Sequence, residues 1–255
     1  MQKTTYLLLV LIAITLSFSL VRRNYFFVQA QAVEQPPGNQ KDTRAERYKE
    51  AKRHFPTVDY DEPNLPDTEE NRAKKEKKKR FNELGNWVYA TTEPHIRETL
   101  SASGGFLHIP ALPVAKSDII LIAVVGEAKA NLSENRRNVF SEFKITVETV
   151  QKTSNEQVRE GSVLTVDRMG GSVKYPNGQT ILYRRSGIYM PKIGGRYLFF
   201  LNSINKHDYG ILTAYELTEA GAIPLDMSSQ FFDLEGKSEA QILREVRDLI
   251  LNSSN

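Results

Sequence analysis

The stretch 139-VFSEFKITVETV-150 decides the fold class of this chain of 255 residues. Phe143, Ile145 and Val147 alternate with charged or hydroxylated residues, so apolar side chains face one way and polar side chains the other. A period of two residues is typical of a strand with one buried and one solvated face. We therefore predict a β-strand here, and its buried face requires partner strands.

Partner strands are indicated on both sides of this stretch. Upstream, Ile119 to Val125 is an uninterrupted apolar run rich in β-branched residues, which predicts a central strand. Downstream, segments of strand character lie between turn residues at 161–168, 172–175, 180–185, 195–203 and 209–217. The pair Gly170 and Gly171 separates two of these segments without the helix that a phosphate-binding loop needs, so it predicts a bend in a strand.

The chain is predicted to end in an amphipathic helix over residues 239–251. Ser238 is the expected N-cap, and Gln241 three residues later completes a capping box. Apolar residues recur at helical spacing as far as Ile250. Several short strands followed by one helix predict a mainly β domain over residues 111–255, a small OB-like antiparallel barrel with a C-terminal helix.

An apolar, uncharged run at residues 6–21 marks the N-terminus. It is shorter than the roughly 20 residues of a typical membrane span, and Ala30-Gln31-Ala32 fits a signal-peptidase site. Residues 1–32 are therefore predicted to be a signal peptide, and a retained membrane anchor formed by residues 6–21 is the alternative. Either form predicts export, to the periplasm or cell envelope or to the extracellular space.

Residues 33–110 are polar, contain several prolines and carry few apolar residues. This composition predicts a flexible, disordered charged tether between the leader and the barrel. Within it, the basic run Lys74–Arg80 suits an anionic membrane or polymer surface, but a solvated linker is the favoured interpretation.

The strand pattern resembles a group of exported bacterial domains of uncharacterised function. The resemblance covers roughly residues 112–250 and rests on 117-SDIILIAVVG-126, 141-SEFKITVETVQK-152, 161-GSVLTVDRMGG-171, 190-MPKIGGRYLFFL-201 and 209-YGILTAYEL-217. The pattern is also similar to OB-like barrels of the netrin-module or metalloproteinase-inhibitor type. The inhibitor domains depend on an N-terminal cysteine and disulfides, and this chain has no cysteine. The resemblance therefore implies a barrel fold without implying inhibition.

Catalytic and metal-binding signatures are missing from the sequence. The chain has four histidines, and they show no metal-ligand spacing: His54, His95, His108 and His207. Neither an HExxH motif nor a G-x-S-x-G elbow is present. Without cysteine, thiolate metal sites and cysteine nucleophiles are excluded. We predict a protein that is not an enzyme and that uses no cofactor or metal.

The distribution of charge suggests a binding face. No acidic residue occurs between Asp167 and Asp208, where arginines and lysines are interleaved with tyrosines. Arginine forks and aromatic rings suit anionic polymers. The predicted ligand-binding residues are Arg168, Tyr175, Tyr183, Arg184, Arg185 and Arg196. Acidic residues on neighbouring strands could instead neutralise this stretch, since residues 116–255 carry equal numbers of acidic and basic residues.

Two functions remain open, and a third, an unrecognised hydrolase, would require polar residues to converge in a cleft. The first is an exported, non-enzymatic binding or adaptor domain of the cell envelope that binds an anionic polymer through the hairpin around Tyr175 and Tyr183. The alternative is an inhibitor-like or structural β-domain that acts by protein–protein contact. Nucleic acid is an unexpected partner, because binders of nucleic acid usually carry a net basic domain. An uncleaved leader would add a membrane contact.

Overall fold

The computed structural model describes residues 46–47, 49–63, 66, 68–82, 87–93, 96–101, 109–185, 187–205, 208–227 and 229–253. Arg47–Asn255 forms one compact unit, and the leader and the cleavage site lie outside the described residues. Within the described ranges, no helix is both long enough and apolar enough to cross a membrane.

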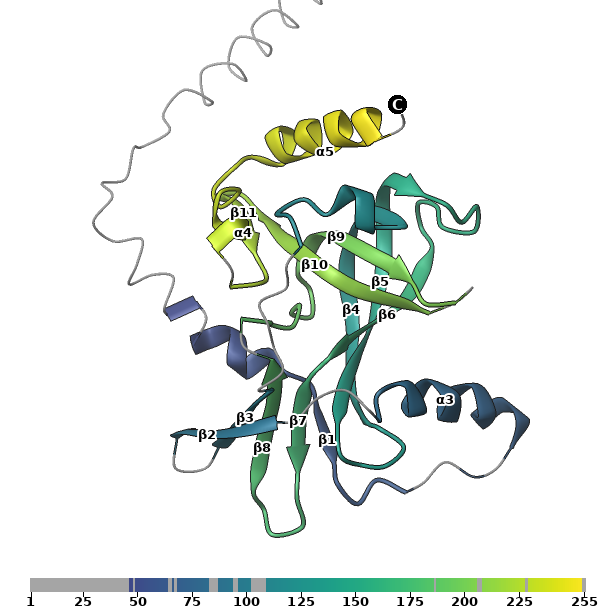
Figure 1. Cartoon of the computed structure of the whole chain (residues 1–255), viewed down its shortest axis with the longest axis vertical. Helices are drawn as coiled ribbons and strands as arrows, with labels where there is room; N and C mark the ends of the chain where they lie inside the picture. Colours follow the sequence, from purple (N-terminus) through teal and green to yellow (C-terminus); the bar gives the residue numbers. More distant parts are fainter. Residues whose placement is uncertain are drawn as a thin grey trace, which may run out of the picture. The chain divides into compact units, whose positions relative to one another are not determined.

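The larger sheet pairs its strands in a ring. Its members are β4 (Ile119–Leu132), β5 (Val139–Thr153), β6 (Val163–Met169), β9 (Arg196–Ser203), β10 (Tyr209–Thr218) and the edge strand β11 (Gly221–Pro224). The order is β11-β10-β6-β5-β4-β9. Because β9 also pairs with β10, the five strands β10, β6, β5, β4 and β9 form a closed ring of pairings (Figure 1). All contacts are antiparallel except the short parallel pairing of β10 with β6.

The alternation in β5 is confirmed. Phe143, Ile145 and Val147 are buried in the interior of the ring, while Lys144 and Thr146 are exposed. The apolar run of β4 has no such alternation because both faces of the strand are covered. Ile119 and Leu121 belong to the interior cluster, whereas Ile120 and Ile122 belong to a second cluster outside the ring.

That second cluster lies beneath the C-terminal helix. The helix α5 spans Glu239–Ser253 and buries Ile242 and Val246 against the outer face of β4 and β9. Ser238 and Gln241 form the capping box, with the Gln241 amide 3.3 Å from Ser238 Oγ and the Ser238 amide 2.8 Å from Gln241 Oε1. The predicted mainly β fold with a C-terminal helix is therefore confirmed. Short helices, η3 (Val114–Lys116) and α4 (Ser229–Phe232), contribute to the same cluster.

The double glycine passes the chain from the ring to a second sheet. This sheet has the order β1-β7-β8-β3-β2, with β1 (Thr57–Asp59), β7 (Gly171–Lys174), β8 (Thr180–Arg185), β3 (Ile96–Ser101) and β2 (Trp87–Glu93). Gly170 has φ +115°, and a Cβ there would lie 2.7 Å from Met190 Cε and 2.9 Å from the Tyr183 carbonyl oxygen. Only glycine fits this bend between β6 and β7.

The described part of residues 33–110 differs from the flexible tether that the composition predicts. Besides β1, β2 and β3 it forms η2 (Lys52–His54) and α3 (Glu69–Arg80). Phe55 belongs to the interior cluster of the ring, and Val58 packs with Leu132 and Val173. Isolated apolar residues in a polar segment are thus buried by strands far away in the sequence, and the boundary predicted at residue 111 does not separate two units.

Candidate binding site beside helix α3

Helix α3 lies against the ring through one buried lysine. Lys77 Nζ is 2.6 Å from Glu142 on β5, 3.2 Å from Asp167 on β6 and 3.0 Å from Asp208, just before β10. Its side chain is only 9% exposed. Arg80, one turn further along α3, places Nη2 3.5 Å from Asp167 and 3.4 Å from Asp208. We call Glu142, Asp167 and Asp208 the carboxylate face.

Burial and pairing compete at this face. Burial lowers the pKa of Lys77, but its three carboxylate partners outweigh burial and leave the pKa above its usual value. Burial raises the pKa of Asp167, and Lys77 and Arg80 offset only part of that rise. Burial also opposes ionisation of Asp208, but Asn205 and Lys77 lower its pKa below the usual value. The carboxylates therefore depend on α3 for their counter-charge.

The end of α3 is held by the loop between β4 and β5. Phe81 stacks on Phe140 with ring centroids 3.9 Å apart and an interplanar angle of 5°. Asn138 donates from Nδ2 to the carbonyls of Phe81 (2.6 Å) and Asn82 (3.1 Å), and the Glu134 amide donates to the Lys78 carbonyl (3.3 Å). These bonds satisfy carbonyls that a helix C-terminus otherwise leaves unpaired.

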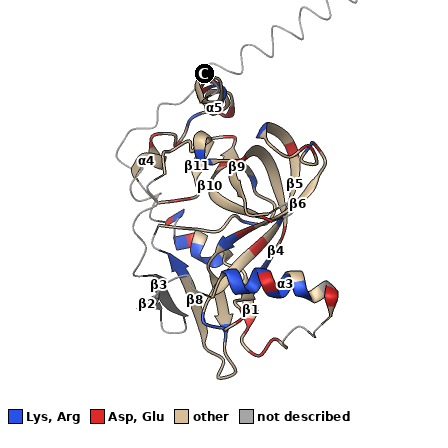
Figure 2. Ribbon diagram, turned by 45° about the vertical axis from the view of Figure 1, so that its right-hand side comes forward, with Lys and Arg blue, Asp and Glu red and all other residues tan. Residues whose placement is uncertain are grey.

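Local sequence explains why this charged segment is helical. The side chain of Thr68 caps the N-terminus by accepting from the Asn71 amide. Glu69 and Glu70 open the helix and basic residues fill its last turn, as the helix dipole favours. Ala73 is the one apolar residue within Glu69–Arg80, and it is exposed. The helix therefore has no apolar stripe. Most of the charged residues that Figure 2 colours on α3 are basic.

Two adjoining cavities of ≈ 280 and ≈ 470 Å³ lie between α3, β4 and β5, and both are lined by Glu62 and Lys78. Among the described residues, seven basic residues line the two cavities: Lys74, Lys75, Lys77, Lys78, Lys129, Lys144 and Arg136. Four acidic residues line them as well: Glu62, Glu127, Glu134 and Glu142. We call these two cavities the lysine groove. Its lining carries a net positive charge.

Lys78 lies at the junction of the two cavities. Burial lowers the pKa of its ammonium group, and the cations of Lys129 and Arg136 lower it further against the opposing carboxylate of Glu62. Arg136 is itself fixed, because its guanidinium donates to the carbonyls of Tyr60 (2.5 Å) and Glu62 (2.8 Å). An anion beside Lys78 would add to the partial compensation that Glu62 and Glu142 give this partly desolvated cation.

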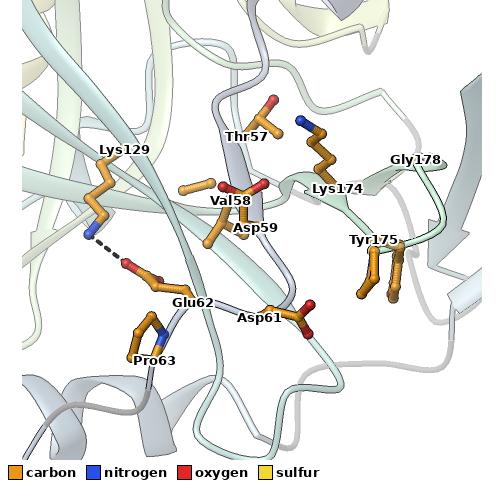
Figure 3. Close-up of a pocket in the computed structure, with 12 residues that line it drawn as sticks. Thr57, Val58, Asp59, Asp61, Glu62, Pro63, Lys129, Lys174, Tyr175 and Gly178 are labelled. Carbon is orange, nitrogen blue, oxygen red and sulfur yellow. Dashed lines mark hydrogen bonds and ion pairs between the residues drawn. The ribbon is translucent and has the colours of Figure 1, made fainter.

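A third cavity, of ≈ 600 Å³, lies beside the tip of the β7–β8 hairpin (Figure 3). Lys174, Tyr175 and Gly178 of the hairpin line it, but so do the carboxylates of Asp59, Asp61 and Glu62. Lys129 reaches it from β4 and pairs with Glu62 at 3.0 Å. The hairpin residues in this cavity therefore lie opposite three carboxylates. Three carboxylates against two lysines disfavour the binding of a polyanion in this cavity.

Two of the six predicted ligand-binding residues are engaged away from the hairpin. Arg168 is 4% exposed and places Nη2 2.5 and 2.6 Å from the carboxylate oxygens of Asp226, which is itself buried. Arg196 pairs with Glu148 on β5 (2.6 Å) and with Glu239 at the start of α5 (2.6 Å). The acids that neutralise the acid-free stretch thus come from other elements, as the sequence allowed.

The remaining four predicted residues lie on or next to the hairpin. The hydroxyl groups of Tyr175 and Tyr183 are 2.6 Å apart, and Tyr175 stacks on Tyr60 with ring centroids 4.9 Å apart. Arg184 lies over the ring of Tyr189, 5.5 Å from its centroid, and Arg185 is half-buried at the end of β8. The structure therefore brings the two tyrosines together and does not gather the four arginines on one face.

Sequence reasoning missed the carboxylate face and the role of Lys77. The one available signal is the basic run Lys74–Arg80, whose charge pattern favours a solvated linker. No group of three or more His, Asp or Glu side chains suited to a metal ion occurs in the part of the chain that the structure describes. Comparisons with protein-family models, curated proteins and solved structures gave no match to this chain.

Proposed function

We propose that the ring is an OB-like barrel and that the chain is an exported, non-enzymatic binding domain. The strand order supports the barrel: β4, β5 and β6 follow one another, β10 joins β6 in parallel, and β9 returns to β4. OB-folds bind oligonucleotides and oligosaccharides over their second and third strands, between two loops. In this ring those strands are β5 and β6. Lys77 of α3 pairs with an acid on each, and the larger cavity of the lysine groove is lined by residues of β5 and by Thr165 of β6.

The ligand we propose is an anionic polymer of the cell envelope, bound in the lysine groove. The observation that carries the proposal is Lys78, a half-buried lysine that lines both cavities, with Arg136 in one and Lys129 in the other. Sulfate or phosphate groups spaced along a polymer could contact Lys78 and Lys129 together. The geometry therefore favours the groove over the hairpin as the anionic site, while the class of ligand stays the one that the sequence suggested.

One observation favours the alternative of a β-domain that acts by protein contact. Arg168 and Arg196, two of the cations expected to bind polymer, are consumed by ion pairs within the fold. In the groove, Lys129 pairs with Glu62 (3.0 Å) and Lys144 with Glu127 (2.8 Å), which leaves less positive potential for a polymer. The experiment below separates the two functions.

The test is binding of the full chain, kept in non-ionic detergent because of its apolar leader, to heparin as a sulfated polymer and to polyphosphate. A groove variant, Lys78→Gln with Lys129→Gln, is compared with a hairpin variant, Arg184→Gln with Arg185→Gln. Lys116→Gln, an exposed lysine of η3, is the matched control. Loss of affinity in the groove variant alone supports the proposal. Loss in the hairpin variant alone returns the site to the hairpin, and no binding at low salt leaves the protein-contact function.

A further inference from the structure

Among the residues that the structure describes, the carboxylate face takes its positive charge from one helix. Glu142 accepts from Asn131 Nδ2 (2.9 Å) and Asp208 from Asn205 Nδ2 (2.7 Å), and both of these donors are neutral amides. Within the described residues, the cations paired with these carboxylates are Lys77 and Arg80. Without α3, the ring would expose three clustered carboxylates that repel one another.

The arrangement of the cations defines what this face recognises. Lys77 and Arg80 are three residues apart, so they lie on the same side of a helix. The ammonium group meets three carboxylates, and the guanidinium group meets Asp167 and Asp208. The face thus presents one position for a compact cation and one for a second cation a helical turn away.

The docking of α3 depends on charge. Among the described side chains of Glu69–Arg80, Lys77 is the one that is buried, and Phe81 follows the helix as a separate apolar anchor. Attraction within a buried ion pair is largely offset by the desolvation of its charges. Arg80 illustrates this cost, because its Nε and Nη1 are buried without a hydrogen-bond partner. A different helix that carries the same cations would form the same ion pairs, so an exchange with α3 would leave the electrostatic balance of the face unchanged.

We propose that the carboxylate face is a docking surface for a basic helix of a partner protein, and that α3 is its built-in occupant. The partner helix carries a lysine and a second cation three residues later. Its binding displaces α3, which pivots about Phe81. This inference goes beyond the proposed function, because it concerns the surface beneath α3 and a cationic partner.

The test supplies the helix in trans. The probe is a fluorescent peptide with the sequence of residues 68–82, and the opened chain is the full-length protein with Lys77→Glu and Arg80→Glu. These substitutions repel α3 from the face and leave the carboxylates vacant. The opened chain should bind the peptide at low ionic strength, where charge interactions are least screened. The wild-type chain should bind it at least about tenfold more weakly, because the apparent Kd rises as the fraction of vacant faces falls.

Two controls make the result specific. A peptide with Lys77→Gln and Arg80→Gln keeps its other lysines and should not bind, and Glu142→Gln with Asp208→Asn in the opened chain should abolish binding. Equal binding of both peptides, or equal binding to wild type and a folded opened chain, would overturn the inference. The inference can fail while heparin still binds the lysine groove, so the two proposals are tested separately.

A second measurement needs no variant. Hydrogen exchange of residues 69–80 in the wild-type chain should become faster when unlabelled peptide is added in excess, because displaced helix loses its protection. The control peptide should leave the exchange unchanged. If the matching peptide also leaves it unchanged, α3 is a permanent part of the fold and the inference is wrong.

Discussion

Replacing Asp226 by asparagine tests whether Arg168 is a structural residue rather than a ligand contact. Both side chains are buried, at 4% and 1% exposure, and the carboxylate holds the guanidinium at 2.5 and 2.6 Å. Thr213 Oγ1 donates to the same carboxylate at 2.8 Å, but the Nη1 of Arg168 has no partner. Asp226→Asn therefore leaves a buried guanidinium without counter-charge.

Removing one partner of a buried ion pair costs about 3–5 kcal/mol. For a domain of 150–250 residues each kcal/mol lowers Tm by roughly 2–4 °C, so the expected decrease is roughly 6–20 °C. Arg168→Met should have a similar effect, and the double variant should lose less than the sum of the two, since neither charge is then left alone. The free energy of unfolding is measured by urea titration.

Arg185→Met is the control, because this half-buried arginine lies at the end of the hairpin strand β8. It should change the free energy of unfolding by less than about 1 kcal/mol, as substitutions outside buried networks usually do. The reasoning is refuted if Asp226→Asn is as mild as the control, or if the effects of Asp226→Asn and Arg168→Met simply add. Either result would mean that Arg168 is free to serve a ligand.

Three further predictions concern the packing of the fold. Gly221→Ala places a Cβ 2.5 Å from the Gly236 carbonyl oxygen at φ +113°, so urea titration should show a loss of more than about 1 kcal/mol, larger than for Gly178→Ala, where a Cβ meets nothing within 4 Å. Ile242→Ala removes a fully buried side chain of α5 and should cost about 2–5 kcal/mol by the same assay. The hydrogen bond from Arg196 holds the pKa of Glu239 below its usual 4.5, so the contribution of Glu239 to stability is present above that pH and is lost as pH falls through the folded-state pKa. Melting curves from neutral pH downward should show this loss in wild type and not in Glu239→Gln.

The strands of the ring and the final helix could be predicted because their signals are local. The alternation in β5 reports its buried and solvated faces directly, and the apolar run of β4 reports burial on both faces. The cap and apolar spacing of α5 lie within one segment. In each case the residues that decide the structure are neighbours in the sequence.

The docking of α3 could not be predicted, because its partners are distant in the sequence. Lys77 pairs with acids more than sixty residues away, on β5, on β6 and just before β10. A helix without an apolar stripe resembles a solvated segment, and nothing near Lys77 marks it as different from Lys79, which is exposed and pairs with Glu76. The same reason explains why Arg168 and Arg196 of the acid-free stretch are paired within the fold: absence of acids in one segment says nothing about acids on adjacent strands.

The most direct test of the proposed function is the salt dependence of heparin binding by the full chain. For single-stranded nucleic acid and B-DNA, each lost cation–phosphate contact lowers the slope of log K against log salt by about 0.7–0.9. By analogy, Lys78→Gln with Lys129→Gln should make the slope for heparin less steep by roughly 1.5, since two contacts are lost. Arg184→Gln with Arg185→Gln should leave it unchanged. A slope that falls in the hairpin variant and not in the groove variant would contradict the account and place the anionic site on the hairpin.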